Sequence, residues 1–257
     1  MDPVLPWLML FATAIFGGSL NAVAGGGTFL TFPSLVFAGI LPKTANVTST
    51  VALWPGTWAS VAAYRRELAH HRPALVAVLA SASLLGGLSG SLLLLSTPQI
   101  TFVRLVPFLL LIATVLFACG RSLTSWLTRW TQVSDATSRR SLVGLWVAQF
   151  VMAIYGGYFG GGLGILMLAA FVAMGIDDIQ EANALKSLLT ACINGVAVIV
   201  FVLSGIVVWP HALVMLGGAV IGGYGAASIA RRIDPRFVRA FVVAVGATMT
   251  LLFFFRA

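Results

Sequence analysis

Two runs of three glycines, Gly25–Gly27 and Gly160–Gly162, are the features of this sequence best suited to binding chemistry. Three consecutive glycines cost about 2–3 kcal/mol of helix propensity relative to alanine, so each run should interrupt a helix. Helices that restart after Gly27 and Gly162 would offer free backbone N–H groups and roughly half a positive charge. Two such N-termini that converge near the midplane of a membrane would form an anion site. The alternative is close helix packing through small residues.

Polar side chains accompany both triplets in runs that are otherwise apolar. Asn21 precedes the first triplet and Thr28 follows it. A single Ser or Thr in such a run more often bonds its own backbone, but a whole polar face indicates a binding surface. The second half supplies such a face at helical spacing i, i+3, i+4, i+7 and i+11: Asn183, Lys186, Ser187, Thr190 and Asn194.

Lys186 is the only charged residue well inside one of these apolar segments. An ionisable group at membrane depth indicates a function by default, here neutralisation of a bound anion. The alternatives are that its side chain reaches the membrane surface or pairs with Asp178 or Glu181. The predicted substrate-binding residues are Asn21, Gly25, Gly26, Gly27, Thr28, Asn46, Thr48, Ser49, Gly160, Gly161, Gly162, Asn183, Lys186, Ser187 and Thr190.

The composition requires lipid as the solvent for the elements that position these residues. Of 257 residues, 60% are hydrophobic and 9% are charged, and the mean hydropathy is +1.03. Such a chain would expose large apolar patches in water, which excludes a soluble enzyme. The runs are apolar on all faces, which excludes the alternating strands of a β-barrel. The net charge of +8 comes from arginines that flank apolar segments, so we expect membrane anchoring and no nucleic-acid partner.

An internal repeat organises the chain. Beyond the triplets, Pro73 matches Pro210 and the pair Gly86-Gly87 matches Gly222-Gly223, at offsets of 135 to 137 residues. We therefore predict a first repeat at 1–120, a polar cytoplasmic linker at 121–140 and a second repeat at 141–257. The apolar segments are expected at about 4–24, 28–41, 44–66, 73–95 and 101–120, then 141–159, 163–176, 182–205, 210–230 and 237–255.

The second segment of each half, 28–41 or 163–176, is too short to cross a bilayer. Fourteen residues reach about 21 Å, against a hydrocarbon core of roughly 30 Å. These segments either span imperfectly or start inside the membrane beside the glycine break. Five segments per half, an odd number, would invert the second repeat relative to the first. The predicted fold is an all-α polytopic membrane protein with two inverted repeats and glycine-broken short helices, which is typical of secondary transporters.

The arginines predict the orientation. Eleven of the 13 lie in three stretches, 65–72, 121–140 and 231–239, while the loops near 96–100 and 206–209 hold none. Basic loops face the cytoplasm, so both termini are expected on the opposite side.

Other chemistries find little support. Gly87-Leu88-Ser89-Gly90 matches the pattern of intramembrane serine proteases, but that reaction needs a base, and the three histidines lie in predicted loops or at the ends of predicted segments. Helix packing is the alternative role for this motif. No group of residues has metal-ligand spacing, so neither a metal nor a cofactor is expected. Cys119 and Cys192 lie in separate apolar runs and are expected to be buried small hydrophobes.

The sequence resembles the TauE/SafE sulfite-exporter family, also called the four-toluene sulfonate uptake permease family. The likeness extends over essentially the whole chain. It rests on Asn21-Ala-Val-Ala-Gly-Gly-Gly-Thr28, Phe32-Pro33, Gly39-Ile40-Leu41-Pro42 and Ala45-Asn46-Val47-Thr48, and on the second-half echo Gly156-Gly157-Tyr158-Phe159-Gly160-Gly161-Gly162 and Ala182-Asn183-Ala184-Leu185-Lys186.

The resemblance implies a secondary transporter that is not an enzyme and moves small sulfur-containing anions, such as sulfite, sulfonates or sulfoacetate, across the cell inner membrane. Alternating access would come from one half rocking against the other, with both termini in the periplasm. An anion channel and an intramembrane hydrolase that uses Ser89 are the alternatives. The sequence allows coupling to a proton or another ion and assembly into a homo-oligomer.

Overall fold

The computed structural model describes residues 5–130, 139–174, 176, 178–229 and 235–256, and within them it contains helices and turns but no strand. In chain order the helices are α1 (Leu5–Val23), α2 (Thr28–Phe37), α3 (Pro42–Ala63), α4 (Arg65–Leu68), α5 (Pro73–Ser96), α6 (Gln99–Trp130), α7 (Arg139–Tyr158), α8 (Leu163–Ala173), α9 (Ile179–Leu203), α10 (Trp209–Ile229) and α11 (Pro235–Arg256). This all-α architecture confirms the predicted fold class.

Five helices, α1, α5, α6, α9 and α10, are long and apolar enough to cross a membrane within the described residues. Large apolar side chains cover the outer faces of these helices and of α11, and Leu203 on α9 and Phe255 on α11 are more than four-fifths exposed. A surface of this kind is stable only against lipid. The protein is therefore a multi-pass membrane protein, as the composition predicted.

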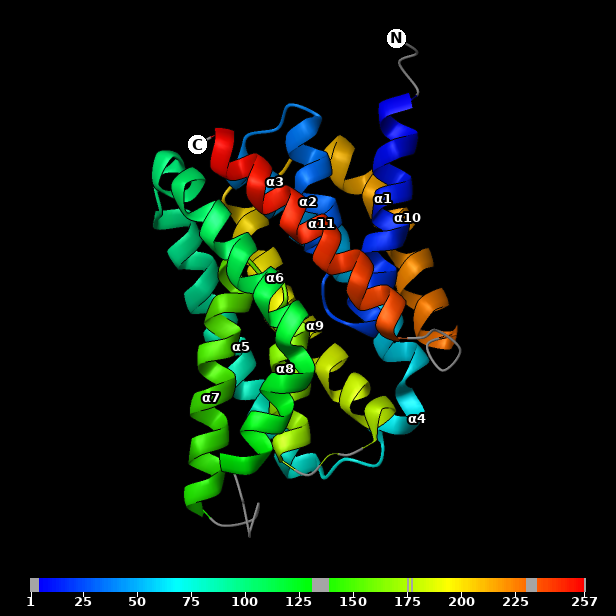
Figure 1. Cartoon of the computed structure of the whole chain (residues 1–257), viewed down its shortest axis with the longest axis vertical. Helices are drawn as coiled ribbons and strands as arrows, with labels where there is room; N and C mark the ends of the chain where they lie inside the picture. The colour runs from blue at the N-terminus through cyan, green and yellow to red at the C-terminus, as the bar shows by residue number, and fades with distance from the viewer. Residues whose placement is uncertain (1–4, 131–138, 175, 177, 230–234, 257) are drawn as a thin grey trace.

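At each glycine triplet one helix ends, and the next helix runs back in roughly the opposite direction. α1 descends from the end of the molecule that holds both termini, and α2 returns toward that end. In the second half α7 rises from the opposite end, and α8 turns back toward it (Figure 1). α2 and α8 have 10 and 11 residues, about 15–17 Å of helix. They are therefore half-helices that end inside the span of their neighbours.

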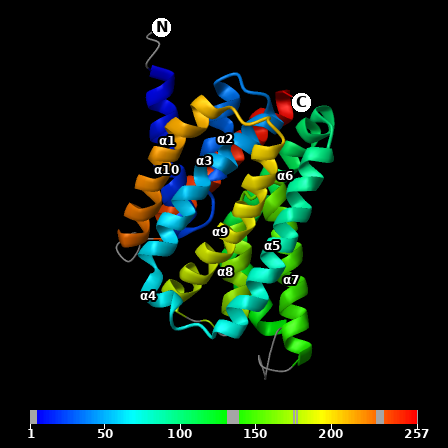
Figure 2. The same ribbon diagram turned by 180° about the vertical axis from the view of Figure 1, so that it is seen from behind.

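The first helix of each half packs against the fourth helix of the other half. α1 lies along α10, and α7 lies along α5, as the two opposite views show (Figures 1 and 2). Equivalent glycines make these contacts: a Cβ on Gly222 would collide with the Ile15 carbonyl, and a Cβ on Gly86 would collide with the Phe150 carbonyl. α3 then joins α1 and α10, and α9 joins α5 and α7. Two bundles result, each assembled from both halves of the sequence.

The interior carries two further arrangements. α3 and α9 contact each other between the bundles, and α6 packs against α11 along the outside of the breaks. The largest apolar cluster includes Phe29, Phe32 and Phe159, whose rings are almost fully buried beside the triplets. The half-helices are thus held in protein and not in lipid, which interrupted backbone at membrane depth requires.

Helical structure extends into the stretch 121–140 that was predicted as a cytoplasmic linker. α6 continues to Trp130, and α7 begins at Arg139. Between them lie only residues 131–138, which are outside the described residues. The stretch 121–130 contains neither proline nor glycine and places Leu123, Trp126, Leu127 and Trp130 at helical spacing. An amphipathic helix leaving the bilayer has no reason to stop there. The short helix α4 was not predicted either.

Candidate functional site

The two interrupted helices meet at a pocket in the middle of the protein. It is formed by the ends of α1 and α7, the beginnings of α2 and α8, and the central turns of α3 and α9. Its lining residues are Asn21, Gly25, Thr28, Thr50, Leu53, Gly156, Phe159, Gly160, Leu163, Gly164, Thr190 and Asn194. The pocket is therefore built almost equally from the two halves of the sequence.

Glycine is required where the two breaks touch. Gly25 has φ +73°, in the left-handed region that side chains disfavour. A Cβ on Gly25 would collide with the Cα of Gly164 and lie 2.8 Å from its nitrogen. Gly160, at φ +77°, occupies the corresponding turn of the second half, but a Cβ there would meet only the Gly156 carbonyl, at 3.1 Å. The two backbone segments can approach this closely only because Gly25 and Gly164 both lack side chains.

Free backbone N–H groups border the pocket from both half-helices. α2 begins at Thr28 and α8 begins at Leu163, directly after the triplets as predicted. In the described part of the chain, neither the Thr28 N–H nor the Gly164 N–H donates a hydrogen bond. Each of these residues lies in the first turn of its helix, where the dipole places partial positive charge. Two electropositive helix ends therefore border one cavity that contains no acidic side chain.

Besides Thr28, four residues with polar side chains line the pocket. Asn21 Oδ1 accepts a hydrogen bond from the Gly27 N–H at 3.2 Å, which leaves its amide nitrogen available as a donor. The Thr50 and Thr190 hydroxyls bond the Asn46 carbonyl and the Met167 sulfur. The Asn194 carboxamide makes no hydrogen bond to a described residue. Leu53, Phe159 and Leu163 provide an apolar wall. The pocket is thus lined by polar groups on one side and by apolar side chains on the other.

A pair of buried polar caps supports the pocket from outside. Asn46 on α3 donates its Nδ2–H to the Tyr158 carbonyl at the end of α7, at 3.0 Å. On α9, Lys186 donates to the Ala22 carbonyl at the end of α1, at 2.8 Å, and to Asn183 Oδ1 at 2.8 Å. Each interrupted helix is thus capped at its C-terminus by the third helix of the other half, once by an amide and once by an amine.

The structure brings together part of the predicted site. Five predicted residues line the pocket: Asn21, Gly25, Thr28, Gly160 and Thr190. The others do not line it and lie in the surrounding protein: Gly26, Gly27, Asn46, Thr48, Ser49, Gly161, Gly162, Asn183, Lys186 and Ser187. Several of these have structural partners. Ser49 bonds Thr31 at 2.6 Å, Thr48 accepts from the Val208 N–H at 3.2 Å, and Gly161 O accepts from the Tyr155 hydroxyl.

Seven lining residues were not among the predicted substrate-binding residues, although Asn194 belongs to the predicted polar face: Thr50, Leu53, Gly156, Phe159, Leu163, Gly164 and Asn194. A helical face contained the signal for three of them. Thr50 lies one turn beyond Asn46, and Asn194 lies one turn beyond Thr190. Gly156 lies one turn before Gly160. The apolar Leu53, Phe159 and Leu163 carry no such signal, because leucine and phenylalanine fill every run of this sequence.

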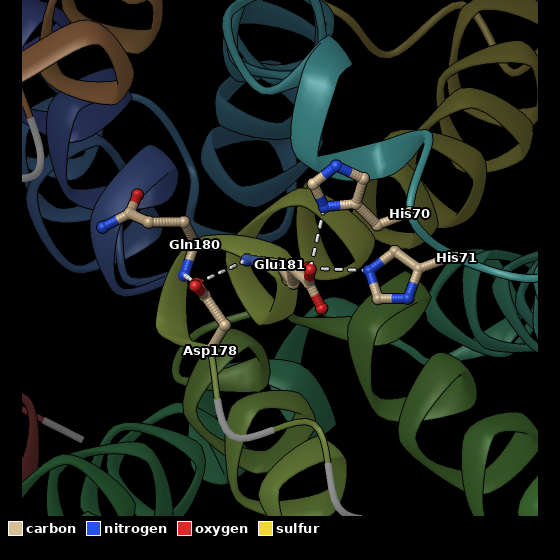
Figure 3. Close-up of polar contacts among 5 residues, drawn as sticks. All are labelled: His70, His71, Asp178, Gln180 and Glu181. Carbon is tan, nitrogen blue, oxygen red and sulfur yellow. Dashed lines mark hydrogen bonds and ion pairs between the residues drawn. The ribbon is translucent and has the colours of Figure 1, made fainter.

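Neither alternative role for Lys186 is observed. Its side chain is 1% exposed and does not reach the surface. Asp178 caps the start of α9 by accepting from the Gln180 and Glu181 N–H groups. Glu181 accepts from His70 Nδ1 at 2.9 Å, and its carbonyl accepts from His71 Nε2 (Figure 3). These two carboxylates are therefore engaged at the surface and do not pair with Lys186.

The residues considered for hydrolysis or metal binding, and the two cysteines, have other surroundings in the structure. The Ser89 hydroxyl donates to the Leu85 carbonyl of its own helix at 2.9 Å. Gly87 and Gly90, on either side of Ser89, pack against α9 and α7. The described residues contain no cluster of metal-ligating side chains. Cys119 is exposed and Cys192 half-buried, which differs from the full burial expected, because both lie on helix faces turned partly outward.

Comparison with known proteins extends these observations. The chain is similar over almost its full length to bacterial proteins that are described as probable membrane transporter proteins. YfcA of Escherichia coli K12 is 26% identical over 94% of this chain and 87% of its own. A protein of Haemophilus influenzae Rd is 27% identical over 94% and 92%, and ORF9 of a Sinorhizobium species is 28% identical over 95% and 91%.

No solved structure matches the chain significantly. A family profile described as sulfite exporter TauE/SafE matches residues 10–253, almost the whole chain. Both breaks, the pocket and its two caps lie within that match. The chain belongs to the TauE/SafE sulfite exporter family of membrane transporters.

Proposed function

We propose that the protein carries small sulfur-containing anions, such as sulfite, sulfonates or sulfoacetate, across the cell inner membrane by alternating access. The observation that carries the proposal is the convergence of two half-helix N-termini on one pocket at the junction of the two halves. Inverted breaks of this kind hold anionic groups in secondary transporters.

The pocket has distinct places for the parts of such a substrate. The free N–H groups of Thr28 and Gly164 supply donors at the positive ends of the helices. The amides of Asn21 and Asn194 supply donors for further oxygens, as a three-oxygen head group requires. Phe159 lies beside these groups and can cover an organic substituent.

The packing of the helices supports a movement other than the rocking of one sequence half against the other sequence half. α10 belongs with α1 and α3, and α7 belongs with α5 and α9. Glycine contacts close enough to exclude a Cβ hold both sets together, and α3 and α9 make the direct contact between the two sets beside the pocket. We propose that these two exchanged bundles, and not the sequence halves, are the bodies that move.

The orientation remains a proposal with a direct test. Both described ends of the chain lie at one end of the molecule, away from α4 with Arg65 and Arg66 (Figure 1). If basic segments face the cytoplasm, a reporter fused after Ala257 is active when it requires the periplasm. A reporter that works only in the cytoplasm, fused at the same point, would contradict this orientation if active.

Binding to purified protein tests the proposed function. Sulfite and alkyl sulfonates should raise the melting temperature, since a ligand that binds only the folded state stabilises it. Asn194→Leu removes an unpartnered amide from the pocket. We expect it to weaken sulfonate binding about tenfold or more, because a hydrogen bond to a charged group contributes about 1.5–3 kcal/mol.

Ser89→Ala is the matched control for Asn194→Leu. Its hydroxyl is exposed and bonded within α5, so this variant should bind as the wild type does. If Asn194→Leu keeps full affinity, the anion does not bind in this pocket. If Ser89→Ala alone abolishes turnover of a substrate, the hydrolase alternative is correct.

A further inference from the structure

Lys186 has the environment of an amine that gains and loses a proton. Its Nζ contacts two neutral oxygens, Ala22 O and Asn183 Oδ1, each at 2.8 Å. Two acceptors match the two N–H donors of a neutral amine, whereas an ammonium has three. The side chain is 1% exposed, and among the described residues no carboxylate forms an ion pair with it. A lone charge buried in this way is strongly unfavourable unless an opposite charge comes close.

The helices around α9 supply no permanent counter-charge. Titratable or basic groups with described side chains lie on or beside α9 and some of the elements packed against it. They are Lys43, Tyr64, Arg65, Arg66, Glu67, His70, His71, Tyr155, Tyr158, Asp178, Glu181 and Cys192. The helices α1, α5 and α8 contribute none. Lys43 donates to the Leu95 and Thr97 carbonyls, and Glu181 accepts from His70. Tyr64 packs in one cluster with Ala22 and Ala184, next to the amine.

The pocket is the nearest place from which a counter-charge can come. Lys186 precedes Thr190 by one helical turn, about 6 Å along the axis, and Thr190 lines the pocket. Its other partner, Ala22, lies between Asn21 and Gly25, which also line it. A bound anion would therefore lie close to the amine, inside protein that screens charge far less than water does.

We propose that Lys186 takes up one proton when an anion enters the pocket and gives it up when the anion leaves, so that the two cross the membrane together. The inference rests on the proposed transport function. The neutral amine, a proton and a monovalent anion become an ammonium next to a bound anion, with no net charge added to the buried site. The corresponding cap in the first half is the amide Asn46, which cannot be protonated in this way, so the ratio is one proton per anion.

Proton uptake during binding tests this directly. Purified wild-type protein in weak buffer is titrated with methanesulfonate, which stays ionised, while a pH indicator reports protons taken up. We expect about one proton per anion bound. Correspondingly, the affinity falls tenfold per pH unit over the range in which the empty site is neutral, because binding and protonation are linked.

Two substitutions separate coupling from structure. Lys186→Arg keeps a permanent positive charge, so it should bind the anion with no proton uptake and with a flat pH profile. Lys43→Met removes a lysine that caps α5 at the other end of the protein and should retain full uptake. Uptake that persists in Lys186→Arg, or wild-type binding without uptake, would overturn the coupling while leaving the transport function intact. A wild-type protein that binds no sulfur oxyanion would overturn both.

Discussion

Gly25→Ala should abolish anion transport and destabilise the protein more than alanine at any other left-handed glycine of the described chain. The new methyl group would be strained at φ +73°, at a cost of about 1–2 kcal/mol. It would also collide with the Gly164 backbone, which cannot yield without moving the α8 N-terminus away from the pocket. We expect a loss of at least 3 kcal/mol in unfolding free energy, as strain and overpacking add. Melting temperature and uptake are measured on the same preparations.

Two other alanine variants separate these contributions. Gly205→Ala has the same left-handed conformation, φ +72°, with nothing within 4 Å of the added Cβ, so it reports the strain alone. Gly164→Ala lies in a right-handed helix and reports the collision alone. We expect near-normal transport from Gly205→Ala and none from Gly164→Ala. A Gly164→Ala protein that transports normally would show that the close approach of the two breaks is not needed.

Cross-linking the two bundles should stop transport completely and reversibly. Lys43 on α3 donates to the Thr97 carbonyl just after α5, at 2.7 Å, and so joins one bundle to the other. In a background of Cys119→Ser and Cys192→Ala, Lys43→Cys with Thr97→Cys places two thiols there. A short bis-thiosulfonate reagent should reduce uptake to background, because alternating access needs the bundles to separate. A reductant should restore it.

A second cysteine pair within one bundle is the control. Trp146 on α7 donates to the Ser81 hydroxyl on α5 at 3.1 Å, and both helices belong to the same bundle. Ser81→Cys with Trp146→Cys should cross-link equally well and leave uptake unchanged. If the Lys43/Thr97 cross-link leaves flux intact, the protein conducts without opening between its bundles and behaves as a channel. If the Ser81/Trp146 cross-link stops flux, the bundles are divided incorrectly.

The positions at which helices are interrupted could be predicted from the sequence, because the low helix propensity of three consecutive glycines is a local property. Helix propensity alone places the starts of α2 and α8 directly after Gly27 and Gly162. Charge-free runs likewise place most of the spans. The stretch 121–130 was predicted as part of a linker because of its polar composition, whereas α6 continues to Trp130. Polarity marks the membrane boundary of a helix, but it does not mark its end.

Exchange between the halves could not be predicted from the sequence. Gly86 and Gly222 were identified as equivalent positions of the repeat, but nothing in either segment indicates which helix it contacts. The same reason limits the site. The polar face of α9 predicted a surface that includes Thr190, but which residues of that face reach the pocket depends on how α1 and α8 lie against it. Lys186 and Asn183 point toward the end of α1 instead.

The exchanged bundles also constrain how the molecule is made. α1 leaves the ribosome well before α10, the helix that covers it. Until then its small-residue face, with Gly18, can be covered only by lipid or by a temporary neighbour. Folding therefore cannot be completed half by half, although chains usually fold one unit at a time during synthesis. Biogenesis must proceed through an inserted but unpacked stage, in which the anion pocket does not yet exist.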